Sequence, residues 1–169
     1  MGKVFWGLLF LFLDVRVQGV LLTPDFVGYI LIGVGVGELP PLKTRKMIRI
    51  LAVLGLAVSA ISWLTVWSAS RELYMVVDLL SLGVQLWTTY YLVLMVEELE
   101  KQSQAVLGAG ELCRRWKIMA VGLVSSLLLS RLQEWLALAA LLVGLVAAVV
   151  YIAAFYRSKK RLEQSRASG

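Results

Sequence analysis

The chain has 169 residues, of which 60% are hydrophobic and 17% are charged. A water-soluble domain usually carries about 45–50% apolar and about 25% charged residues, and the interior of so short a chain is too small to hide the surplus. Composition therefore argues against an ordinary soluble domain and favours lipid as the solvent. The formal charge of +6 lies in short basic clusters beside apolar segments, which is typical of membrane topology signals rather than of nucleic-acid binding.

The residue types needed for common catalytic and metal sites are scarce. The chain contains one cysteine, Cys113, and no histidine. An intramolecular disulfide, histidine catalysis and a Cys/His zinc site are therefore excluded. No nucleophile, metal-ligand set or phosphate-binding glycine loop accompanies the carboxylates, so we expect no cofactor and regard an enzyme as the least favoured class.

Residues 3–37 are predicted to form a short helical hairpin. The first arm is apolar over residues 4–13 and ends at a polar stretch. Residues 23–25, Thr-Pro-Asp, form a favourable helix start because threonine can cap, proline suits the first helical position and aspartate faces the positive end of the helix dipole. Arms of about 13–15 residues are about 20–22 Å long. The hairpin therefore either spans a thinned bilayer or enters it as a re-entrant pair.

Four longer apolar segments follow the hairpin. They cover residues 47–67, 73–96, 116–130 and 135–156. A span needs about 20 apolar residues, so these segments and the hairpin predict an all-α membrane bundle of six helices in a single domain over residues 1–156. Residues 157–169 are expected to form a basic cytoplasmic tail.

The distribution of basic residues predicts the orientation of this bundle. Of the 17 Lys and Arg residues, only Arg16, Arg71 and Arg131 lie on the side that the helix order places outside. Positive charge is enriched in cytoplasmic loops. The sequence therefore predicts a multi-pass protein of the cell membrane with its N- and C-termini both in the cytoplasm.

Small residues recur at four-residue spacing in three of the predicted helices. The series are Gly33 and Gly37; Gly122, Ser126 and Ser130; and Ala140, Gly144 and Ala148. Such rows allow close contact between helices in a membrane. We interpret them as packing sites inside the bundle, with a homo-oligomer face as the alternative.

Ionisable and amide side chains collect near the outer ends of the predicted helices. The candidate ligand-binding residues are Asp14, Arg16, Asp25, Asp78 and Gln85. Charged groups at membrane depth are costly and are functional candidates by default, and an arginine cannot escape burial by losing its proton. These residues predict an outward-facing polar recess centred on Arg16. The alternative is that Arg16 pairs with Asp14 or Asp25 and braces the hairpin.

The N-terminal residues resemble a known group of proteins. Residues 12–16 read Phe-Leu-Asp-Val-Arg, and residues 22–32 read Leu-Thr-Pro-Asp-Phe-Val-Gly-Tyr-Ile-Leu-Ile. This pattern is similar to the opening of small uncharacterised polytopic membrane proteins of Gram-positive bacteria, in which Leu-Asp-x-Arg precedes Leu-Pro-Asp-Phe-x-Gly-Tyr; here Thr23 stands where that pattern often has leucine. The resemblance implies the bacterial cytoplasmic membrane and no particular activity. Length and number of spans also resemble the membrane-embedded substrate-binding subunits of energy-coupling-factor vitamin transporters.

Two function classes follow from these features. The leading interpretation is a small membrane transport component, either a carrier or a membrane-embedded binding subunit. The alternative is a non-transporting scaffold or regulatory subunit that binds another membrane protein. The expected partners are the lipid bilayer and either another membrane protein or a second copy of this chain.

Overall fold

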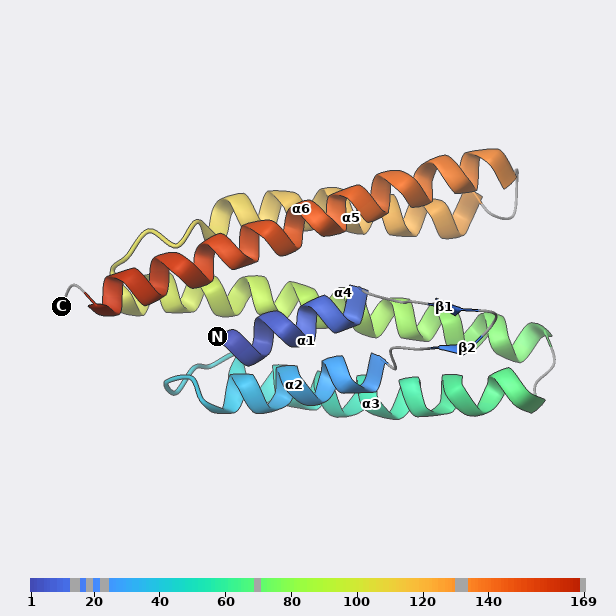
Figure 1. Ribbon diagram of the computed structural model, residues 1–169, viewed down its shortest axis with the longest axis horizontal. Coiled ribbons are helices and arrows are strands. Elements are labelled where there is room, and N and C mark those ends of the chain that lie inside the picture. Colours follow the sequence, from blue (N-terminus) through green and yellow to red (C-terminus); the bar gives the residue numbers. More distant parts are fainter. Residues whose placement is uncertain (13–15, 18–19, 22–24, 69–70, 130–133, 168–169) are drawn as a thin grey trace. The chain divides into compact units, whose positions relative to one another are not determined.

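The computed structural model describes residues 1–12, 16–17, 20–21, 25–68, 71–129 and 134–167. These residues form six helices and one small β ladder (Figure 1). The helices are α1 (Gly2–Phe12), α2 (Asp25–Gly37), α3 (Arg45–Ser68), α4 (Arg71–Ser103), α5 (Ala109–Leu129) and α6 (Glu134–Ala167), and the strands are β1 (Arg16–Val17) and β2 (Val20–Leu21). The prediction of a helical fold with six helices is confirmed for the described part of the chain.

The helices form two compact units, Met1–Met95 and Val96–Gly169. The first unit contains α1, α2, α3 and most of α4, and the second contains the end of α4 with α5 and α6. The sequence predicts a single domain over residues 1–156, whereas the contacts between helices divide the chain inside α4. Each unit therefore has its own set of packed helices.

In the first unit, α1 and α2 run antiparallel (Figure 1) and pack backbone against backbone. A Cβ atom at Gly7 would lie 2.7 Å from the carbonyl oxygen of Gly28, and one at Gly28 would lie 2.8 Å from the carbonyl oxygen of Gly7. Two turns further along α2, a Cβ atom at Gly35 would lie 2.7 Å from the backbone nitrogen of Val4. Side chains do not tolerate such distances, so glycine at these positions sets the separation of the two helices.

The glycines in this contact differ from the pair singled out by four-residue spacing. A Cβ atom at Gly33 would make an ordinary 3.6 Å contact with Ala52 of α3, and Gly37 lies beside the guanidinium of Arg49. Gly28 and Gly35 are seven residues apart, which is two helical turns and also returns to one face. The packing face of α2 toward α1 is therefore the one that carries Gly28 and Gly35.

The hairpin is closed at both ends. Beyond α1, the antiparallel ladder pairs Arg16 with Leu21 and Val17 with Val20. At the other end, Lys3 of α1 forms an ion pair with Glu38, just after α2. The two pairings restrain the same hairpin from opposite ends.

Helix α2 also packs on α3 and ends at a defined cap. The ring of Tyr29 lies directly against Gly55 of α3, so that no side chain fits at that glycine. Arg45 Nη2 donates a hydrogen bond of 2.6 Å to the carbonyl oxygen of Gly37. The last carbonyls of a helix have no partner within the helix, and this arginine supplies one for α2. Pro40 and Pro41 follow, and proline cannot continue the hydrogen-bonding pattern.

In the second unit, α5 and α6 are antiparallel and cross closely (Figure 1). A Cβ atom at Gly122 would lie 2.9 Å from the Cα atom of Gly144. These two residues belong to two of the small-residue series predicted to pack inside the bundle, and the contact between them confirms that interpretation for this pair.

Helices α5 and α6 both extend further than the apolar segments of the sequence. Helix α5 begins at Ala109, whose backbone N–H donates to Glu100 Oε2 over 2.9 Å; an acidic cap favours the positive end of a helix. Helix α6 continues to Ala167 through the residues expected to form a tail. Leu162 is buried there, and Lys159 pairs with Glu163 one turn on at 3.7 Å. Packing and this pairing extend the helix beyond its apolar part.

Two described helices are long and apolar enough to cross a membrane, Val76–Ser103 and Leu138–Ser165. Their apolar side chains are largely exposed: Leu80 of α4 is 56% exposed, and Val146 of α6 is 60% exposed. Soluble monomers rarely expose contiguous apolar patches larger than a few hundred Å². This surface favours membrane association. Helices α1 and α2 are apolar but shorter, at about 17 and 20 Å against a hydrocarbon core of about 30 Å.

Replacing Gly28 by alanine is expected to destabilise the protein by about 1–3 kcal/mol, the usual cost of overpacking a tight contact. The new methyl group would meet the backbone of Gly7 and Leu11, which cannot rotate away. Gly83→Ala is the matched control, because Gly83 lies inside α4 with nothing within 4 Å of its Cβ position, and alanine there should stabilise the helix by about 0.4–1 kcal/mol. Thermal unfolding in one detergent measures both variants. A Gly28→Ala variant as stable as the wild type would contradict the close packing.

Candidate functional site

The structure describes four of the five predicted site residues, at least in their backbone. Asp14 lies outside the described residues, and so does any pairing that it makes. Arg16 begins β1, where its backbone pairs with Leu21. Asp25 begins α2 and is half-buried. Asp78 is exposed in α4, and Gln85, two turns further along the same helix, is half-buried.

Gln85 is bound to the N-terminal hairpin. Its Nε2 atom donates a hydrogen bond of 3.3 Å to the carbonyl oxygen of Leu11, near the end of α1. Carbonyls in the last turn of a helix need a partner from elsewhere. Gln85 therefore joins α4 to α1 inside the first unit, and this contact gives it a structural role.

The polar residues that follow Gln85 in α4 bond within their own helix. Thr88 and Thr89 are fully buried. The hydroxyl of Thr88 donates to the carbonyl oxygen of Val84 at 2.7 Å, and that of Thr89 lies 2.9 Å from the carbonyl oxygen of Gln85. Threonine commonly bonds the preceding helical turn in this way. Both hydroxyl groups are therefore satisfied within α4.

Asp78 has a different environment from Gln85. It is exposed, and Val76, Leu79 and Leu80 around it are exposed apolar residues. Within the described part of the chain no hydrogen bond or ion pair engages its carboxylate. It lies about 10 Å along the axis from the start of α4, at 1.5 Å per residue. Asp78 is thus a carboxylate on an otherwise apolar helix surface.

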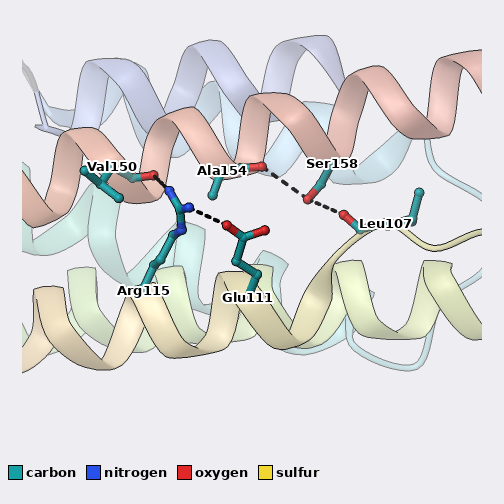
Figure 2. A network of polar contacts seen from close by, with 6 residues as sticks. All are labelled: Leu107, Glu111, Arg115, Val150, Ala154 and Ser158. Atoms are coloured by element: carbon teal, nitrogen blue, oxygen red, sulfur yellow. Dashed lines mark hydrogen bonds and ion pairs between the residues drawn. The ribbon is translucent and has the colours of Figure 1, made fainter.

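The second unit contains a polar network that the sequence analysis did not identify (Figure 2). Arg115 of α5 forms an ion pair with Glu111 one turn earlier, and its Nη1 atom donates to the carbonyl oxygen of Val150 of α6 at 3.3 Å. The four-residue spacing of Glu111 and Arg115 could have predicted their ion pair. The hydrogen bond to α6 could not be predicted, because it depends on how the two helices align.

A buried serine ties the loop before α5 to α6. Ser158 is 2% exposed, and its Oγ atom lies 2.8 Å from the carbonyl oxygen of Leu107 and 3.2 Å from that of Ala154 (Figure 2). Gly108 follows with a φ of +86°, a conformation that favours glycine. This network fixes the α4–α5 loop against α6 and shows no arrangement for chemistry.

Two cavities of about 410 and 570 Å³ lie along α5 and α6. Their linings are almost entirely apolar, apart from Arg115, Lys117 and Ser125. None of the predicted site residues lines either cavity. Among the described residues, no group of three His, Cys, Asp or Glu side chains could hold a metal ion.

Comparison with known proteins found no matching family model, no matching curated protein and no matching solved structure. The similarity of residues 12–32 to a group of Gram-positive membrane proteins therefore stays a prediction.

Proposed function

We propose that this chain is a multi-pass protein of the bacterial cytoplasmic membrane, with six membrane helices and both termini in the cytoplasm. The exposed apolar faces of α4 and α6 support a location in lipid. The basic clusters at residues 43–49, 114–117 and 157–161 support the orientation, because positive charge is retained on the cytoplasmic side. The α1–α2 hairpin is too short for two ordinary spans, and it enters the bilayer as a closed pair.

The orientation makes a direct prediction for cysteine labelling. In a Cys113→Ala background, single cysteines at Lys46 and Lys160 should resist a membrane-impermeant maleimide in intact cells. Single cysteines at Arg71 and Arg131 should react with it, because the topology places them outside. Permeabilised cells provide the control in which all four positions react. Labelling of Lys46→Cys or Lys160→Cys from outside intact cells would contradict the orientation.

In this proposal the chain acts as a membrane-embedded component of a transport system. The observation that carries the proposal is Asp78, an exposed carboxylate among exposed apolar residues of a candidate span. An ionisable group in such a place commonly serves an ion or substrate pathway or meets a charged partner. A transport component needs an ionisable group of this kind to bind its solute or its partner. A surface that only contacts lipid has no need of one.

A binding subunit fits the described residues better than a self-contained carrier. A carrier needs a polar path through its own helices, yet Gln85 bonds to Leu11 and the buried Thr88 and Thr89 bond within α4. The remaining candidate, Asp78, faces outward, where a partner subunit or a solute at an interface would reach it. Asp14, Arg16 and Asp25 stay in the proposal as further polar residues at the predicted outer ends of the helices.

The competing function is a scaffold or regulatory subunit without transport. The apolar face of α6 favours it, since large exposed apolar surfaces often mark sites of protein association. Both functions involve binding inside the membrane. They differ in whether the carboxylate of Asp78 matters for the movement of a solute.

The two functions are separated by uptake measurements in cells that lack the chain. Uptake of a panel of labelled vitamins, amino acids and divalent cations should fall for at least one solute. Asp78→Asn should lower the uptake of the same solute about tenfold, which corresponds to about 1.4 kcal/mol. Glu163→Gln is the control, because Glu163 is an exposed carboxylate in the polar end of α6, and it should leave uptake unchanged. Unchanged uptake of every solute after deletion would contradict the transport function and favour the scaffold.

A further inference from the structure

An apolar groove runs along the α5–α6 pair, and its lining includes neither Asp78 nor any residue of the α1–α2 hairpin. The two cavities on this pair adjoin, because Ile118 and Val143 line both. Their volumes of about 410 and 570 Å³ lie in the range of small-molecule sites, about 300–1,000 Å³. Together they form one elongated groove along the surface of the two helices.

Small residues line part of the groove. Gly122 touches Gly144 where the helices cross, and Ala139 and Ala140 line the groove beside this contact. From Arg115 to Leu129 the groove follows about 21 Å of α5. One leaflet supplies about 15 Å of hydrocarbon, half of a core of about 30 Å. A single acyl chain lying along the helices would therefore contact apolar side chains through the whole thickness of one leaflet.

One end of the groove is basic. Lys117 and Arg115 line this end, and Arg114 is exposed beside them. Arg115 is partly neutralised by Glu111. In the described part of the chain, Arg114 and Lys117 make no hydrogen bond or ion pair. The long stem of a lysine can lie along apolar surface while its ammonium group reaches the headgroup region.

We propose that this groove binds one anionic phospholipid, with an acyl chain between α5 and α6 and the phosphate group at Lys117 and Arg114. Charge complementarity selects this occupant. A zwitterionic lipid such as phosphatidylcholine carries a quaternary ammonium beside its phosphate and has no net charge, whereas basic residues at the ends of membrane helices attract headgroups with net negative charge. The proposal depends on the membrane location of α5 and α6 and is independent of a role in transport.

A second copy of the chain fits the same groove less well. Two copies in one membrane share the same orientation, so that a two-fold interface brings residues of equal depth together. The basic end of one groove would then meet Arg114, Arg115 and Lys117 of the other copy, and like charges in an interface oppose association. An anionic lipid removes this repulsion and fills the groove.

Native mass spectrometry of the full chain in mild detergent tests the proposal, with dioleoyl phosphatidylglycerol and dioleoyl phosphatidylcholine as probes. One phosphatidylglycerol should bind per chain, in clear preference to phosphatidylcholine. Lys117→Gln should weaken this binding about fivefold, since one basic side chain near an anionic surface contributes about 1 kcal/mol. Lys160→Gln is the matched control, because Lys160 is an exposed lysine of α6 outside the groove, and it should have no effect.

The groove itself is tested by filling it. Ala139→Phe should abolish binding of the phosphatidylglycerol, whereas Ala153→Phe, an exposed position of α6 outside both cavities, should not. Circular dichroism establishes that each variant is folded, and Ala139→Leu provides a milder filling variant. Equal binding of both lipids would overturn the anionic selectivity. Retained binding in folded Ala139→Phe and Ala139→Leu would overturn the groove as the site, and so would a lipid-free dimer cross-linked through Ser125→Cys.

Discussion

Helices in lipid gain nothing from hiding apolar side chains from water, so their association depends on close packing and on hydrogen bonds between them. In the membrane location that we propose, this constraint explains the glycine contacts in both units. Gly7, Gly28 and Gly35 bring α1 and α2 into backbone contact, and Gly122 and Gly144 do the same for α5 and α6. Large apolar residues such as Leu142 and Val146 point outward. Other large apolar residues, such as Leu92, Tyr151 and Phe155, are buried between the helices.

The proposed lipid environment also constrains the polar groups. A backbone or side-chain polar group without a partner costs several kcal/mol in hydrocarbon. Thr88 and Ser158 accordingly bond to carbonyl groups, and Gln85 bonds to the last turn of α1. Gln85, a candidate ligand-binding residue in the sequence, thus has a structural contact. Among the candidates whose side chains the structure describes, Asp78 is the exposed one, and it therefore carries the functional proposal.

Local sequence signals predicted the helices well and their contacts poorly. Apolar run lengths gave six helices, and the acidic residue of the Thr-Pro-Asp sequence is the first residue of α2. The extension of α6 through Ser158 and Leu162 was missed, because it depends on packing against a distant loop. The two-residue strands were missed because four residues carry no periodicity. For the site, the acceptor of Gln85 could not be predicted, since Leu11 is 74 residues away in the chain.

The central claim is that the outward apolar faces of these helices lie in lipid. Nitroxide labels placed one at a time along residues 138–150 of α6, in the protein reconstituted into vesicles, test it most directly. The account predicts frequent collisions with oxygen and few with a water-soluble nickel complex at exposed positions such as Leu142, Val146 and Val149. Ala147 and Ala148 are buried, so labels there should collide rarely with either reagent. Frequent collisions with the nickel complex along the exposed face would contradict the account, because they would place that face of α6 in water.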